Sequence, residues 1–152
     1  TGLRCVVLGA GGAARSVVWA LADAGAASVV VVNRSADRAV VAADLAGPVG
    51  RVGTPADIAD AQLVVNATSV GMGAELGADG PLPCDPALIG PGQVVVDLVY
   101  QPLVTPLLAL AHERGARPVD GLGMLVHQAA ISIRRWVGVE PDLEAMAIAA
   151  RR

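Results

Sequence analysis

A glycine-rich turn near the start of the chain has the residue types and spacing of a phosphate-binding site. Gly9, Gly11 and Ala14 follow an apolar run at residues 5–8 and precede apolar residues at helical spacing. The first glycine of such a turn permits the tight bend, and the second lets a phosphate approach the free N–H groups at the helix N-terminus. The turn is therefore predicted to bind the pyrophosphate of a dinucleotide. The alternative is a glycine-rich turn without a ligand, which this context disfavours.

The residues after the second strand indicate which dinucleotide would bind. An NAD site usually has Asp or Glu there to accept hydrogen bonds from the ribose 2′-hydroxyl, whereas a 2′-phosphate needs positive charge. Here the strand at residues 28–32 is followed by Asn33, Arg34 and Ser35, with Arg38 one helical turn later. Guanidinium groups form strong charge-assisted hydrogen bonds with phosphate. The expected cofactor is NADP, and the alternative is that both arginines are solvated surface charges.

The elements that would position these residues indicate an α/β fold. Apolar runs of strand length alternate with helical patterns, as in a parallel sheet covered on both faces. The expected strands are residues 5–8, 28–32, 49–52, 62–66, 94–97 and 117–120. The expected helices are residues 17–25, 37–45, 105–115, 122–137 and 142–150. Residues 71–92 are expected to form a long loop with one helical turn at 85–89. The predicted fold is one Rossmann-like, doubly wound parallel sheet of about six strands.

Composition excludes several classes of protein. The chain has 152 residues, of which 54% are hydrophobic and 16% charged, so it is not a disordered polyelectrolyte. Its net charge of −3 argues against nonspecific nucleic-acid binding. The longest apolar stretch, residues 17–32, contains Asp23 and Gly25 and is short for a membrane span. Since no signal peptide is visible either, we expect a soluble, cytoplasmic protein.

Two further compositional features limit the chemistry that the chain can do. Cys5 and Cys84 are too few for a disulfide framework and lack metal-ligand spacing, so no metal site is expected. All eleven residues in the Lys+Arg count are Arg, because the sequence contains no Lys. Any mechanism that needs a lysine must therefore find it outside these residues.

Polar residues also follow three later strands at the edge where ligands bind in open α/β sheets. They lie in residues 66–72, 97–102 and 120–129. Taken one by one, these segments are ordinary loop caps, but together with the glycine turn they form a set.

With these motifs, the sequence resembles the shikimate dehydrogenase family, specifically its C-terminal NADP-binding domain. The matching stretches are Val7-Leu8-Gly9-Ala10-Gly11-Gly12-Ala13-Ala14-Arg15, Asn33-Arg34-Ser35 with Arg38, Asn66-Ala67-Thr68-Ser69 through Met72, Asp97 to Pro102, and Gly121 through Gln128. The family reduces 3-dehydroshikimate to shikimate with NADPH in aromatic amino acid biosynthesis. The resemblance implies that function and an NADP cofactor.

The resemblance also implies roles for individual residues. The pyrophosphate would be held by Gly9, Ala10, Gly11, Gly12 and Ala13, and the 2′-phosphate by Asn33, Arg34, Ser35 and Arg38. The cofactor cleft would be lined by Thr68 and Ser69, with Leu98, Gly121 and Met124 near the nicotinamide. Tyr100 and Gln128 would reach the substrate, shikimate or 3-dehydroshikimate.

The family's substrate domain, with its Ser-rich stretch and catalytic Lys–Asp pair, precedes this region and is not in the sequence. We therefore assign no catalytic residue to this chain, and we expect cofactor binding without robust turnover. His112 and His127 are expected to be structural. The first residue, Thr1 rather than Met, fits an excised domain, although N-terminal processing would give the same start.

The C-terminal helices, about residues 125–152, would pack toward the substrate domain. Without that domain, the apolar residues Ile131, Ile133, Trp136 and Val137 are expected to form an exposed patch that promotes self-association.

Three alternatives remain at this point. A quinate/shikimate dehydrogenase paralogue would share this cofactor domain, and its substrate preference would depend on the other domain. A non-enzymatic NADPH-binding module is the alternative outside the enzymes. A methyltransferase also uses a glycine turn, but it would need a carboxylate where Arg34 stands.

Overall fold

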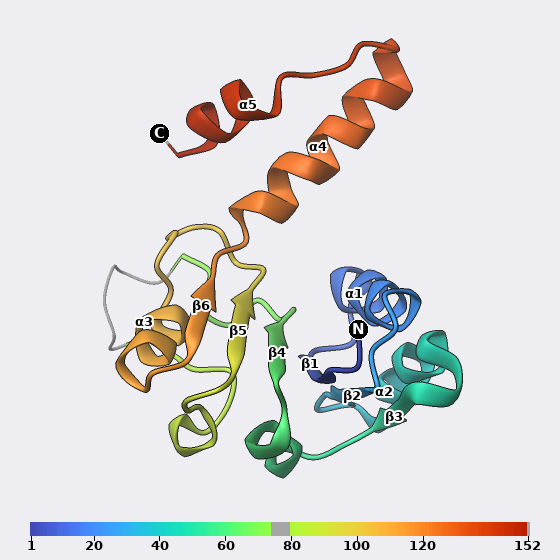
Figure 1. The fold of residues 1–152 in the computed structure, drawn as a ribbon, viewed down its shortest axis with the longest axis vertical. Helices are drawn as coiled ribbons and strands as arrows, with labels where there is room; N and C mark the ends of the chain where they lie inside the picture. The colour runs from blue at the N-terminus through green and yellow to red at the C-terminus, as the bar shows by residue number, and fades with distance from the viewer. Residues whose placement is uncertain (74–79, 152) are drawn as a thin grey trace.

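The protein is a six-stranded parallel sheet covered by helices on both faces, as the computed structural model shows (Figure 1). The structure describes residues 1–73 and 80–151. The strands are β1 (Arg4–Leu8), β2 (Ser28–Val32), β3 (Gly50–Val52), β4 (Leu63–Asn66), β5 (Val94–Asp97) and β6 (Arg117–Val119). Their order is β3-β2-β1-β4-β5-β6, and every pair of neighbours is parallel. This order confirms the predicted Rossmann-like α/β fold and places its switch point between β1 and β4.

One face of the sheet is covered by α1 (Gly12–Asp23), α2 (Ala36–Ala43) and the 3₁₀ helix η1 (Asp44–Val49). The other face is covered by α3 (Pro106–Glu113) and two short 3₁₀ helices, η2 (Pro55–Asp60) and η3 (Pro86–Leu88). Alternate residues of each strand enter different cores: Val7 packs with α1, and Val6 packs with η2 and α3. Because both faces of the central strands are buried, β1, β2, β4 and β5 consist mainly of valine and other apolar residues, unlike the exposed edge strands β3 and β6.

The predicted strands agree with the structure to within about one residue, but the helices differ in three places. The helix expected at residues 17–25 is α1, which begins at Gly12, directly after the glycine turn, and ends at Asp23. The helix expected at residues 37–45 ends as α2 at Ala43 and continues as η1, which is broken at Gly47 with φ of 56°. The 3₁₀ helix η2 was not predicted. Its signal is a capping-box pattern of Thr54 and Asp57 around Pro55, in which the Thr54 N–H donates to Asp57 Oδ2 at 2.7 Å.

The loop expected at residues 71–92 is described except for residues 74–79, which lie outside the described part of the chain. The single helical turn predicted within it is η3. Asp85 caps this turn, since its Oδ1 accepts a hydrogen bond from the Ala87 N–H at 2.9 Å.

The last two helices, α4 (Leu122–Val137) and α5 (Leu143–Ala150), extend beyond the carboxyl edge of the sheet (Figure 1). They pack against each other and leave large apolar side chains exposed, with Trp136 83% exposed and Val137 67% exposed. Ile131 is also exposed, whereas Ile133 is half-buried. Among the described residues, no helix is both long enough and apolar enough to cross a membrane.

The start of α4 is fixed by a close approach of two backbones. A Cβ atom on Gly121 would lie 2.6 Å from the Leu98 carbonyl oxygen and 2.8 Å from that of Asp97. A Cβ on Gly123, two residues later, would meet nothing within 4 Å. Only the first glycine is therefore needed to bring α4 against the end of β5.

These two glycines give a matched pair of variants. Gly121→Ala should lower the free energy of unfolding by about 2 kcal/mol, because the new methyl group meets backbone that must shift. Gly123→Ala should raise it by about 0.5 kcal/mol through helix propensity. Urea denaturation followed by circular dichroism measures both. Equal effects of the two substitutions would show that the contact with Leu98 does not constrain α4.

Candidate functional site

The carboxyl edge of the sheet carries a cavity of about 740 Å³, here called the edge cavity. It lies at the switch point, where the turn after β1 faces the loop after β4. The described residues that line it are Leu8, Gly9, Ala10, Gly11, Val32, Asn33, Arg34, Gly53, Thr54, Pro55, Ala67, Thr68, Ser69, Val70, Leu82 and Pro83. No carboxylate is among them, and Arg34 is the one charged residue in this set.

Gly9 joins the two walls of the edge cavity. Its φ of +106° is a conformation that residues with side chains rarely adopt, and a Cβ would lie 3.0 Å from the Ala67 carbonyl oxygen. Its N–H donates to the carbonyl of Val32 at 2.8 Å, so the turn is also fixed to the end of β2. The tight turn predicted from the sequence is therefore required by both conformation and packing.

The N-terminus of α1 offers free hydrogen-bond donors toward this edge. Its first helical bond runs from the Arg15 N–H to the Gly11 carbonyl at 3.0 Å, so the three preceding N–H groups have no helical partner. No described side chain caps this end. A Cβ on Gly11 or Gly12 would meet nothing within 4 Å, and neither glycine has a positive φ. The protein itself does not need glycine at these two positions, and the space they leave fits a phosphate group.

Three of the four residues predicted for the 2′-phosphate line two adjoining cavities, and Ser35 lines neither. Asn33 and Arg34 line the edge cavity, and Asn33 Nδ2 donates to the Ser35 carbonyl at 3.0 Å. Ser35 is the N-cap residue of α2, where its side chain makes no capping hydrogen bond. Arg38 instead lines a cavity of about 400 Å³ between α1 and α2, here called the helix cavity. The two cavities share Ala10 and Gly11.

A buried carboxylate organises the opposite wall of the site. Asp97, at the end of β5, is 0% exposed and accepts three hydrogen bonds. Asn66 Nδ2 donates to its Oδ1 at 2.9 Å, and the Val99 N–H donates to the same oxygen at 3.0 Å. Thr105 Oγ1 donates to Oδ2 at 2.7 Å and caps α3 by accepting from the Leu108 N–H. One side chain therefore fixes β4, the loop after β5 and the start of α3.

Asn66, held by Asp97, also fixes the loop that lines the edge cavity. Its Oδ1 accepts hydrogen bonds from the N–H of Thr68 at 3.1 Å and from Thr68 Oγ1 at 2.7 Å. Thr68 Oγ1 in turn accepts from the Val70 N–H at 3.1 Å. The Thr68 hydroxyl is therefore used within its own loop, and it shapes the cavity wall. The Asn66–Asp97 pair was not predicted from the sequence, although both are polar residues that end apolar strands.

The remaining predicted site residues lie outside the edge cavity. Leu98 is half-buried beneath Gly121, as the short approach of their backbones shows. Tyr100 is 42% exposed and Met124 is 37% exposed, while Gln128 is exposed on α4. These side chains are therefore accessible to a ligand or to another domain.

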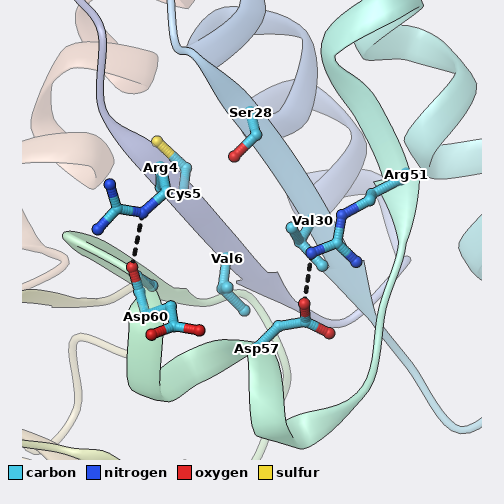
Figure 2. A pocket seen from close by; sticks show the side chains of 9 residues that line it. Arg4, Cys5, Val6, Ser28, Val30, Arg51, Asp57 and Asp60 are labelled. Carbon is cyan, nitrogen blue, oxygen red and sulfur yellow. Dashed lines mark hydrogen bonds and ion pairs between the residues drawn. The ribbon is translucent and has the colours of Figure 1, made fainter.

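A third concavity, of about 330 Å³, lies on the sheet face that η2 covers and is lined mainly by charged residues and strand side chains (Figure 2). Arg51 forms an ion pair with Asp57, and Arg4 Nε donates to the Asp60 carbonyl at 2.9 Å. The hydrogen bond from Arg51 holds the pKa of Asp57 below its usual value. These contacts join the lining residues to one another, and the pocket lies away from the carboxyl edge, so it is not the candidate site.

Neither cysteine is poised for nucleophilic chemistry. Burial raises the pKa of the Cys5 thiol, and burial together with nearby Asp85 raises that of Cys84 to about 11. Both thiols are therefore protonated at neutral pH. Across residues 1–73 and 80–151, no three His, Cys, Asp or Glu side chains cluster in a way that could hold a metal ion.

The buried carboxylate leads to a prediction about stability. Asp97→Ala leaves three buried donors without an acceptor and should lower the free energy of unfolding by about 3 kcal/mol. Asp97→Asn keeps an acceptor oxygen and the shape of the side chain, so its loss should be smaller. Urea denaturation at neutral pH compares the two variants, and equal losses would contradict the network.

A comparison of the wild type with Asp97→Asn also tests pH dependence. Burial raises the pKa of the Asp97 carboxyl above its ordinary value, so the folded protein binds this proton more tightly than the unfolded chain does. The wild type should therefore lose stability relative to Asp97→Asn as the pH rises from about 3.9 to the raised pKa of Asp97. Above that pKa, the difference in unfolding free energy between the two proteins should no longer change with pH. A relative stability that increases with pH would contradict the dominance of burial.

Two family models match the chain. The model for shikimate / quinate 5-dehydrogenase matches residues 1–70, and that for the shikimate 5′-dehydrogenase C-terminal domain matches residues 121–151. The chain is 47% identical over 146 residues to the shikimate dehydrogenase (NADP(+)) of Gluconobacter oxydans, covering 93% of this chain and 50% of that protein. The chain thus spans about half the length of the relatives it matches.

Solved structures of similar proteins share the fold. Shikimate 5-dehydrogenase from Thermus thermophilus, in complex with NADP(H) and shikimate, is 39% identical with a TM-score of 0.86, covering 99% of this chain and 55% of that one. Quinate dehydrogenase from Corynebacterium glutamicum, in complex with NAD, is 32% identical with a TM-score of 0.84, covering 97% and 55%. Family models, sequence relatives and fold agree along the chain, which therefore belongs to the shikimate dehydrogenase family.

Proposed function

We propose that the chain is the NADP(H)-binding part of a shikimate 5-dehydrogenase, which reversibly reduces 3-dehydroshikimate to shikimate with NADPH. One observation carries the proposal. The uncapped N-terminus of α1 opens beside a cavity whose described lining includes Arg34 and no carboxylate. A dinucleotide with a 2′-phosphate complements both features, because its phosphates need N–H donors and positive charge.

The cofactor would supply the hydride, and the chain would hold and orient it. The pyrophosphate would bind the backbone of Gly9, Ala10, Gly11, Gly12 and Ala13, and the 2′-phosphate would bind Asn33, Arg34, Ser35 and Arg38. Thr68 and Ser69 would form the wall beside the cofactor, with Leu98, Gly121 and Met124 near the nicotinamide. The fixed wall built on Asp97 would keep this arrangement in place without further ordering.

The substrate would be bound mainly by residues elsewhere in a longer protein, which would also supply the proton-transfer groups. The chain contains no lysine, and Tyr100 and Gln128 stand exposed at the carboxyl edge, where they could reach a substrate. In this proposal residues 1–152 form the cofactor domain, and α4 and α5 pack their exposed apolar side chains against the substrate domain. In the chain alone, the same side chains would promote self-association.

A quinate/shikimate dehydrogenase paralogue is the second candidate, favoured by the similarity to a quinate dehydrogenase. That relative was solved with NAD, whereas Arg34 here stands where an NAD site would have a carboxylate. Cofactor preference therefore favours the NADP-dependent enzyme. The choice between quinate and shikimate depends on residues that contact the substrate.

Arg34→Ala should weaken NADP⁺ binding by about tenfold or more, because a charge-assisted hydrogen bond to phosphate contributes about 1.5–3 kcal/mol. Its effect on NAD⁺ should be less than about twofold, since NAD⁺ lacks the 2′-phosphate. Isothermal titration of the 152-residue chain measures both affinities. Arg114→Ala, at the far end of α3, is the matched control and should change neither affinity.

If Arg34→Ala weakened the binding of NADP⁺ and NAD⁺ equally, the assignment of Arg34 to the 2′-phosphate would be wrong. The same titrated protein should bind NADP⁺ without robust turnover when shikimate is added. Full activity of the chain alone would contradict the placement of the acid–base groups outside it.

A further inference from the structure

The helix cavity holds an arginine to which the cofactor site described above gives no role. Its described lining residues are Ala10, Gly11, Gly12, Arg15, Asp37, Arg38 and Val41. Arg15 comes from α1 and Arg38 from α2, so the two guanidinium groups border the same space from different helices. Through Ala10 and Gly11 this space adjoins the edge cavity, where Arg34 lies.

Both arginines extend from firmly held backbone. Arg15 follows Ala14, and Arg38 precedes Ala39; each of these alanines is 0% exposed and belongs to the same core. The Arg15 N–H is also hydrogen-bonded to the Gly11 carbonyl, which places Arg15 one helical turn beyond the glycine turn. The origin of the Arg15 side chain is therefore fixed relative to both the glycine turn and α2.

The charges around the two cavities do not balance. Arg15, Arg34 and Arg38 line them, and Asp37 is the one acidic residue in the described lining. Neither Arg15 nor Arg38 takes part in an ion pair in the part of the chain that the structure describes, although Asp37 borders the same cavity. This excess of positive charge occurs in a chain with a net charge of −3. A phosphate monoester, with a charge of about −1.5 to −2, complements it.

The position of Arg15 indicates which phosphate it would contact. The pyrophosphate can be bound by the backbone N–H groups at the start of α1, which need no side chain. The helix cavity opens instead toward α2, whose Arg38 is a predicted partner of the 2′-phosphate. Two guanidinium groups approaching from different helices can bind one phosphate from two sides.

We propose that Arg15 is a further specificity-determining residue, a third arginine of the 2′-phosphate site that favours NADP(H) over NAD(H). This inference rests on the proposed function and adds a residue from α1 to a site otherwise built by the end of β2 and the start of α2. Arg15 would thereby link the glycine turn to the part of the cofactor that determines selectivity.

The test compares Arg15→Ala with the wild-type 152-residue chain in titrations with NADP⁺, NAD⁺ and 2′,5′-ADP at fixed ionic strength. The substitution should weaken NADP⁺ and 2′,5′-ADP binding about five- to tenfold and NAD⁺ binding less than about twofold. Arg15→Lys keeps a positive charge but loses the guanidinium fork, so it should recover part of the loss. Arg114→Ala is the control for removal of an exposed arginine.

Two outcomes would overturn the proposal. If Arg15→Ala weakened the binding of NADP⁺ and NAD⁺ equally, Arg15 would instead bind the pyrophosphate or stabilise α1. An unchanged affinity for NADP⁺ in Arg15→Ala, with a clear loss in Arg34→Ala, would reject Arg15 and leave the proposed function intact. Failure of the wild type to bind either dinucleotide would refute the proposed function itself, and the inference with it.

Discussion

The hydrogen bond between the side chains of Asn66 and Asp97 is the contact on which the candidate site depends most. It joins β4 to β5 at their carboxyl ends, in a place where neither side chain reaches water. A buried carboxylate is tolerated only when donors surround it, and Asp97 has three. Because those donors come from β4, from the loop after β5 and from α3, satisfying one charge fixes three segments at once.

The other wall of the site is formed by glycines, which have no side chains. Gly9 lets the turn after β1 approach the Ala67 carbonyl, while Gly11 and Gly12 leave open space in front of the first N–H groups of α1. The edge cavity thus lies between a wall whose polar groups are satisfied internally and a wall whose donors are free. Such a combination favours a ligand that brings its own negative charge.

The fold and the glycine turn could be predicted because each depends on short stretches of sequence. Valine runs in β1, β2 and β5 specify buried parallel strands, and the spacing of Gly9 and Gly11 specifies the turn. The Asn66–Asp97 pair could not be found in this way, because it requires that β4 and β5 be neighbours, and hydrophobic periodicity does not give strand order.

The division of the arginines between two cavities depends on tertiary packing in the same way. From the sequence, Arg34 and Arg38 were predicted for one site, and in the structure they line two adjoining cavities that share Ala10 and Gly11. The packing of α1 beside α2 adds Arg15 to the lining of the helix cavity. The 3₁₀ helix η2 was missed for a local reason. Its six residues are too few to show a hydrophobic period, and only its capping box marks it.

The most direct test of the central claim is a crystal structure of the chain grown with NADP⁺. The pyrophosphate should lie against the N–H groups at the start of α1, and the 2′-phosphate should lie beside Arg34 and Arg38. Cofactor bound elsewhere, such as in the charged concavity formed by Arg4 and Arg51, or bound without contact to the glycine turn, would contradict it.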